Sequence, residues 1–155
     1  KGFFMVNVCV TGGLKKDREL IDDIVWWCKD MLLPRHRVID IEVKLIKTFE
    51  EGAEGFCYRG GDDRDFHIEI DHRLSRTVSR EEFIEVVIHE MIHVWQGTTN
   101  RLIDKLKGGS YKQMWMCKDG KYRNYTETKY EKQPWEVEAY KMSGPLTKHY
   151  MDQEL

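Results

Sequence analysis

The chain has 155 residues, a length that suits one compact domain with a sizeable hydrophobic core over residues 1–155. Apolar residues make up 41% of the chain, which argues against disorder, and a net charge of -2 gives no sign of bulk nucleic-acid or membrane-surface binding. No apolar run approaches the roughly 20 residues that a membrane-spanning helix needs. The 4 cysteines are scattered and form no C-x-x-C pair. We therefore expect a cytoplasmic protein with buried, unpaired thiols and no membrane partner.

Hydrophobic periodicity divides the first half of the chain into strands and one helix. Residues 3–10 are β-prone, and apolar residues recur at helical spacing over 17–33, where Pro34 ends the helix. Residues 38–49 and 65–71 alternate between apolar and polar side chains, as half-buried strands do. Glycines surround a short apolar segment between these two strands. Together with the helices expected further on, this order indicates an α+β domain.

The next helix, expected over residues 79–96, begins with a capping box in which Ser79 is the N-cap. Inside the helix lies His89-Glu90-Met91-Ile92-His93, an H-E-x-x-H sequence. Residues i and i+4 share one helix face, so both imidazoles can reach one Zn²⁺ as metal ligands. Glu90, about 100° further around the helix, can take a proton from a metal-bound water as the catalytic base. The alternative is a core helix whose two histidines are satisfied by hydrogen bonds, because the neighbouring residues are apolar nearly all round.

A third ligand has to come from elsewhere, because a catalytic zinc usually has three protein ligands. The longer pattern H-E-x-x-H-x-x-G-x-x-H does not apply, since Gln96 and Thr99 stand at its glycine and final histidine. The other histidines are His36, His67, His72 and His149. A better source is the segment 134–140, which carries Glu136 and Glu138, and helix phase alone does not choose between these two glutamates.

The second half of the chain has weaker patterns. Residues 100–106 are expected to form a short helix, and residues 108–133 a loop or a loose hairpin around Asp119-Gly120. A helix follows from Pro134 to about residue 142, and Gly144-Pro145 is expected to break it. Basic and aromatic residues alternate over 111–130, which would suit nucleic acid, but a solvated loop is the favoured interpretation.

At the H-E-x-x-H sequence and the later glutamate, the chain resembles the zincin metallopeptidases, and among them the gluzincin branch. Over residues 56–142 it also resembles small SprT-like proteins of phages and bacteria. The resemblance implies a zincin-like α+β domain, in which a twisted, mostly antiparallel sheet packs on the motif helix and a later helix brings another ligand. It also implies that Glu136 is the third zinc ligand, while Tyr140 stands where the branch usually has Asp or Asn.

The resemblance further implies hydrolysis of a peptide bond, with a peptide or protein substrate lying along an edge strand of the sheet. The candidate for that strand is Asp65–Asp71, just before the motif helix. Candidate donors to the oxyanion are Tyr122, Tyr125, Tyr130, Tyr140 and His149. The alternative from another class is a catalytically inactive metal-binding module that binds a protein partner. The intact Glu90 favours hydrolysis, because a structural zinc site needs no general base.

Overall fold

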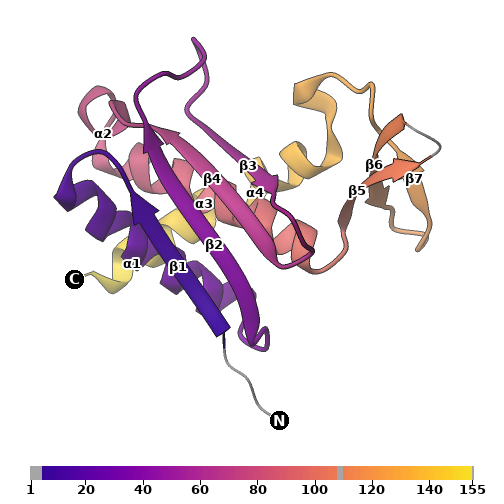
Figure 1. The fold of residues 1–155 in the computed structure, drawn as a ribbon, viewed down its shortest axis with the longest axis horizontal. Coiled ribbons are helices and arrows are strands. Elements are labelled where there is room, and N and C mark those ends of the chain that lie inside the picture. Colours follow the sequence, from indigo (N-terminus) through magenta and orange to yellow (C-terminus); the bar gives the residue numbers. More distant parts are fainter. Residues whose placement is uncertain (1–4, 108–109, 155) are drawn as a thin grey trace.

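The computed structural model describes residues 5–107 and 110–154, and Figure 1 shows a main sheet in front of its helices with a smaller sheet to one side. The elements in chain order are β1 (Met5–Thr11), α1 (Lys15–Leu32), β2 (Val38–Ile46), β3 (Gly55–Arg59), β4 (Asp65–Asp71), α2 (Leu74–Thr77), α3 (Arg80–Thr98), β5 (Leu102–Lys107), β6 (Ser110–Met116), β7 (Tyr122–Asn124), the 3-10 helix η1 (Tyr130–Lys132) and α4 (Pro134–Gln153).

The main sheet has the strand order β1-β2-β4-β3 and is mixed rather than mostly antiparallel. Strands β1, β2 and β4 run parallel, and only β3 runs antiparallel to its neighbour β4. The expectation of a mostly antiparallel main sheet is therefore wrong. The strands β1 and β2 are parallel because helix α1 connects them. This helix returns the chain to the starting end of the sheet, so that β2 runs in the same direction as β1.

The strand 65–71 forms with the expected bounds, but it is not an edge strand. It lies as β4 between β2 and β3, with hydrogen-bonded neighbours on both sides. The edge strand that contacts helix α3 is β3, residues 55–59, and not the strand 65–71.

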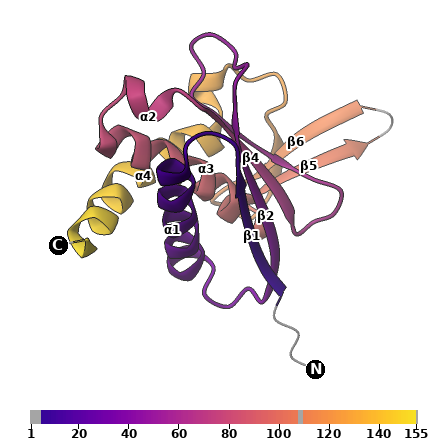
Figure 2. The same ribbon diagram turned by 60° about the vertical axis from the view of Figure 1, so that its left-hand side comes forward.

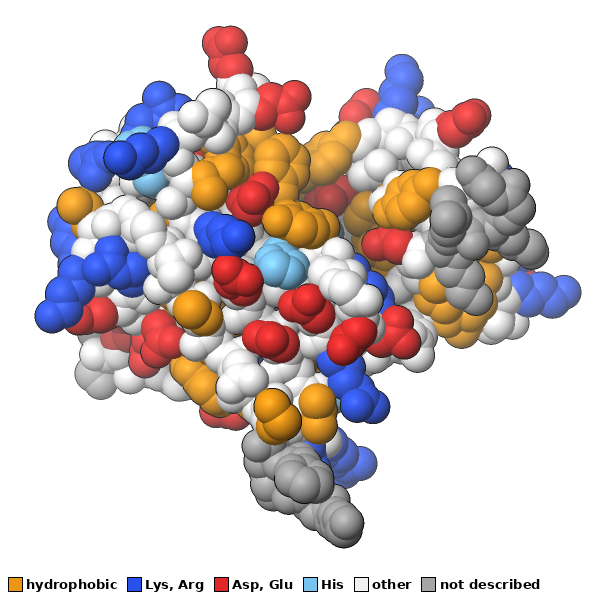
Figure 3. All heavy atoms as spheres, viewed as in Figure 1, with side chains coloured by type: hydrophobic (Ala, Val, Ile, Leu, Met, Phe, Trp, Pro, Cys, Tyr) orange, Lys and Arg blue, Asp and Glu red, His pale blue; other side chains and the backbone are white. Residues whose placement is uncertain are grey.

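The helices cover one face of the main sheet and leave the other open (Figure 2). The core lies between the sheet and the helices α1 and α3, and it includes Ile24, Ile41, Ile68 and Val87. Charged side chains spread over the open face (Figure 3), because the polar positions of the alternating strands point there. No helix in the described part of the chain is long and apolar enough to cross a membrane.

Of two expectations for residues 100–133, one fails and one is confirmed. Residues 102–107 form strand β5 rather than a short helix, because β5 pairs with β6 from Leu102 opposite Trp115 onwards. The expected hairpin around Asp119-Gly120 is confirmed, as β6 pairs with β7. Partners distant in sequence thus decide the conformation of a segment whose own pattern is ambiguous.

Helix α4 does not break at Gly144-Pro145 but continues to Gln153. A proline inside a helix removes one backbone hydrogen bond, and packing on both sides offsets that loss. Ser143 and Thr147 are buried on either side of it, and the Thr147 hydroxyl donates to the Ser143 carbonyl at 2.7 Å. The thiols also differ from expectation, since all four are free but only Cys28 is buried, and Cys9 is exposed.

Candidate metal centre

Helix α3 places His89 and His93 on one face, one turn apart. The helix starts as expected, because the Ser79 side chain accepts a hydrogen bond from the backbone amide of Glu82 at 3.1 Å. The two imidazole rings have centroids 4.8 Å apart and lie nearly perpendicular, at 86°. Both residues are largely removed from solvent, and both turn Nε2 toward helix α4.

Helix α4 supplies the third member of the group. Glu136 Oε1 lies 2.9 Å from His89 Nε2 and 3.2 Å from His93 Nε2. Glu138 points elsewhere and accepts hydrogen bonds from Gln96 and Arg101. Of the two glutamates left open by helix phase, the structure therefore brings Glu136 to the histidines, 43 residues along the chain from His93.

The donor atoms of His89, His93 and Glu136 all lie within 4.8 Å of one another, as a group that could hold a metal ion requires. Two ligands that each stand about 2.0–2.1 Å from a tetrahedral zinc are about 3.4 Å apart, and the two nitrogen–oxygen distances come close to that value. Two imidazole nitrogens and one carboxylate oxygen also match the ligand types of catalytic zinc sites. The residues present therefore fit Zn²⁺.

The charges in this group depend on one another. Burial opposes the charged form of His93, but the hydrogen bond and negative charge of Glu136 outweigh it and raise the pKa of His93 to about 9. Burial likewise opposes ionisation of Glu136, yet hydrogen bonds from both histidines bring its pKa down to about 2. Without a metal, the positive charge of protonated His93 therefore balances the negative charge of the Glu136 carboxylate. A bound metal cation would replace that proton and balance the carboxylate instead.

Gln96 fixes the orientation of His93. Its Nε2 donates to the carbonyl of Trp135 at 2.9 Å and to Glu138, so its Oε1 faces Nδ1 of His93 at 2.8 Å. The Nδ1–H of His93 donates to that oxygen, which leaves Nε2 for the metal. The sequence pattern assigned no role to Gln96, although its position three residues after His93 places it on the same face of the helix.

Glu90 lies beside the group and belongs to the same cavity. Only 5% of it is exposed, and no described residue hydrogen-bonds to its carboxylate. Burial raises the pKa of Glu90, while the charges of His93 and His89 oppose that rise. Strand β3 comes close here, since a methyl group at Gly55 would stand 3.1 Å from Glu90 Oε2.

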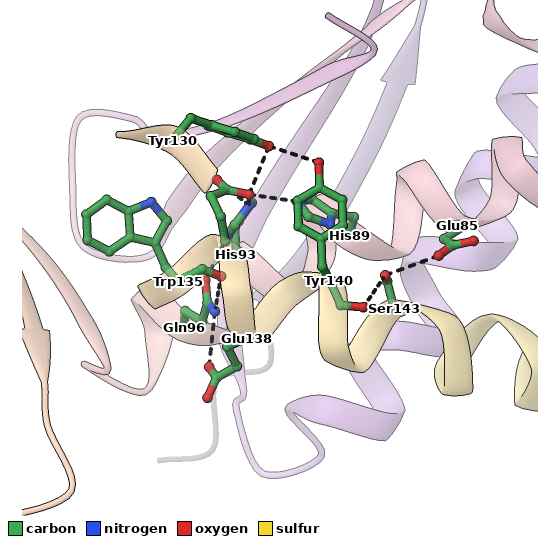
Figure 4. A network of polar contacts seen from close by, with 10 residues as sticks. Glu85, His89, His93, Gln96, Tyr130, Trp135, Glu138, Tyr140 and Ser143 are labelled. Carbon is green, nitrogen blue, oxygen red and sulfur yellow. Dashed lines mark hydrogen bonds and ion pairs between the residues drawn. The ribbon is translucent and has the colours of Figure 1, made fainter. Parts of the chain in front are cut away.

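Two of the candidate oxyanion donors also reach the cavity. The Tyr130 hydroxyl donates to Glu136 Oε1 at 3.0 Å and lies 3.3 Å from the hydroxyl of Tyr140 (Figure 4). The ring centroid of Tyr140 is 4.5 Å from that of His89. Tyr140, which stands where the gluzincin pattern usually has Asp or Asn, thus packs on a ligand-type histidine.

The remaining candidates lie outside the cavity. The Tyr122 hydroxyl donates to the carbonyl of Asn100, and the Tyr125 hydroxyl lies 3.8 Å from the Cys117 thiol. His149 packs edge-on against Trp27, and His67 stacks on Tyr58 on the open face of the sheet. Of the five residues considered as oxyanion donors, only Tyr130 and Tyr140 line the cavity.

The cavity has a volume of about 610 Å³ and runs along α3 between the β2–β3 loop, strand β3 and helix α4. His89, Glu90, His93 and Glu136 all line it. Cavities of this size hold small ligands or a few side chains of a peptide. The candidate metal centre is thus open to a molecule from solvent.

Comparisons of the chain with protein-family models, with curated proteins and with solved structures found no match. What supports the resemblance is the H-x-x-x-H spacing on α3 together with the His89, His93 and Glu136 group.

Proposed function

We propose that the protein is a zinc-dependent metallopeptidase with His89, His93 and Glu136 as zinc ligands and Glu90 as the general base. One arrangement carries the proposal: the donor atoms of His89, His93 and Glu136 lie within 4.8 Å of one another, and the buried carboxylate of Glu90 lines the same cavity. A structural zinc site normally has four protein ligands and no use for such a carboxylate.

The chemistry divides between the metal and Glu90. Bound zinc would supply a Lewis acid and a water whose pKa is lowered toward neutrality. With the metal bound, the Glu90 carboxylate would take a proton from the attacking water and pass it to the leaving amine. Its raised pKa supports this role, because a base with a pKa nearer to neutral can both accept and return a proton.

Tyr130 is the better of the two hydroxyl candidates for stabilising the developing oxyanion. Its hydroxyl already points at the ligand carboxylate of Glu136, at 3.0 Å. This hydroxyl can rotate about its C–O bond, so it could donate instead to a substrate oxygen beside the ligands. The hydroxyl of Tyr140 lies 3.3 Å from that of Tyr130, and its ring packs on the ring of His89. Tyr140 therefore helps to position Tyr130 and His89.

Strand β3 favours a peptide over a smaller amide as the substrate. It is an edge strand, so the backbone groups on its outer side have no partner within the main sheet. Phe56 and Cys57 of this strand line the cavity that holds Glu90. An extended peptide can add to this edge by backbone hydrogen bonds while its side chains enter the cavity.

The test combines metal content with hydrolysis. Elemental analysis of the purified chain is expected to give one zinc per chain, and incubation with a peptide library is expected to give cleavage. Glu90→Gln should keep the zinc and abolish cleavage, whereas Glu81→Gln, exposed on the first turn of the same helix, should keep both. Bound zinc without cleavage in the parent chain would point to the metal-binding module instead. Failure to bind zinc, even when it is added back, would make α3 a core helix.

A further inference from the structure

The cavity beside the candidate metal centre is strongly acidic. Outside the metal group and Glu90, five more carboxylates line it, and its described lining includes no Lys or Arg. These five residues are Glu50, Glu51, Glu54, Glu82 and Glu85. The chain as a whole has nearly equal numbers of acidic and basic residues, 27 and 25, so this separation of charge is local.

Two elements that are distant in sequence bring these carboxylates together. Glu50, Glu51 and Glu54 stand on the loop between β2 and β3, which projects from one end of the main sheet and carries acidic side chains at its tip (Figures 1 and 3). Glu82 and Glu85 lie seven and four residues before His89, so they continue its helix face toward the start of α3. These five carboxylates form an acidic wall of the cavity, and this wall begins one helical turn from the candidate ligands.

Nothing in the described part of the chain neutralises this wall. None of the five carboxylates forms an ion pair there, although Arg73, Arg80 and Arg101 each pair with a carboxylate elsewhere. Glu85 accepts only a weak hydrogen bond from the Ser143 hydroxyl, at 3.3 Å. Like charges held together without counterions repel one another, so a cationic ligand would relieve this repulsion.

The environment of Glu90 is a second observation that points to a bound molecule in this cavity. Glu90, nine-tenths buried and without a hydrogen-bond partner, faces into the same cavity. A buried polar group without a partner is costly unless a bound molecule satisfies it. The carboxylates therefore stand beside a site that is built for a polar ligand.

We infer that the cavity selects a basic peptide, with a lysine or arginine close to the bond that is cut. This inference rests on the proposed function and names its substrate class. A lysine ammonium or an arginine guanidinium can pair with the carboxylates of the β2–β3 loop and of α3. The apolar stem of either side chain can lie on Phe56, Val86 and Tyr140, which also line the cavity.

Binding tests the inference without requiring hydrolysis. Two fluorescent peptides of identical sequence, except that the lysines of one are glutamines in the other, are titrated into zinc-loaded Glu90→Gln protein and into the zinc-free parent chain. Fluorescence anisotropy is expected to show roughly tenfold or tighter binding of the lysine peptide. Raising the salt concentration should reduce this preference, because the carboxylates are largely exposed.

Charge-reversal variants locate the interaction. Glu51→Lys combined with Glu54→Lys is expected to weaken binding of the lysine peptide about tenfold and to leave the zinc content at one per chain. Asp30→Lys combined with Asp152→Lys changes the net charge equally at exposed positions outside the cavity, and it should leave the affinity unchanged. Equal losses in both double variants, or equal affinity for both peptides, would overturn the inference.

The outcome separates this inference from the proposed function. Selective binding of the lysine peptide without any cleavage by the parent chain would support the basic specificity and reject hydrolysis. Cleavage of a peptide library with no enrichment of lysine or arginine near the cut bond would support hydrolysis and reject the basic specificity.

Discussion

Gln96 and His93 are joined by a hydrogen bond of 2.8 Å between Oε1 and Nδ1, and this bond connects the two helices that make the candidate metal centre. The same amide donates to the Trp135 carbonyl at the start of α4, one residue before Glu136. One side chain therefore orients a ligand on α3 and fixes the backbone next to a ligand on α4.

Replacing this amide should weaken metal binding without removing a ligand. Gln96→Met keeps most of the volume but loses the hydrogen bonds to His93, Trp135 and Glu138, so the affinity for zinc is expected to fall about 10- to 100-fold. Competition with a chromophoric chelator measures the change. Gln153→Met, at the exposed end of α4, is the matched control and should bind zinc like the parent chain. An unchanged affinity for zinc in Gln96→Met would show that His93 binds the metal without being oriented by Gln96.

The pair of His93 and Glu136 gives the metal-free protein a characteristic dependence on pH. The pKa of Glu136 is about 2 in the folded state against an ordinary value of 4.5, so its contribution is complete above pH 4.5 and is lost as the pH falls through 2. The pKa of His93 is about 9 against 6.5, so its contribution is complete below pH 6.5 and is lost as the pH rises through 9. Both contributions are complete between pH 4.5 and 6.5.

Thermal unfolding in the presence of a chelator checks this window. The difference in Tm between the parent chain and Glu136→Gln is expected to be largest between pH 4.5 and 6.5, at several degrees. It should shrink as the pH is raised toward 9. A difference that grows between pH 6.5 and 9 would contradict a protonated His93 beside an ionised Glu136.

How much of this site could be predicted from the sequence depends on the range of the contacts. His89 and His93 are four residues apart on one helix, so local geometry alone brings them together. Glu136 depends on α3 packing against α4, and neither helix phase nor spacing distinguishes it from Glu138. Only the packed structure shows that Arg101 and Gln96 hold Glu138 away from the histidines.

The same distinction explains the errors in the fold. Alternation located the strand 65–71 with the observed bounds, because alternation is a local property. Its neighbours β2 and β3 are set by tertiary pairing, which alternation does not encode. Likewise, the chain around Leu102 forms a strand because β6 pairs with it, and the helix after Pro134 continues through Pro145 because the residues around it are buried.

Gly55 is expected to control the position of the proposed base. Because a methyl group there would stand 3.1 Å from Glu90 Oε2, the larger side chain of Gly55→Val should displace the carboxylate. Hydrolysis is then expected to fall about tenfold or more, since small displacements of reacting groups are costly, while the zinc content stays at one per chain. Gly61→Val is the control, because a side chain at Gly61 meets open space. Activity in Gly55→Val equal to that of the control would place the base elsewhere.

Tyr130 should affect turnover and not metal binding. Tyr130→Phe removes a hydroxyl that lies 3.0 Å from Glu136 Oε1 but keeps the ring in the cavity wall. If this hydroxyl donates to the oxyanion, kcat is expected to fall about 10²- to 10³-fold, with KM nearly unchanged and one zinc per chain. Tyr125→Phe, whose hydroxyl contacts Cys117 outside the cavity, should keep full activity. A rise in KM with unchanged kcat would instead make Tyr130 a residue that binds substrate without stabilising the transition state.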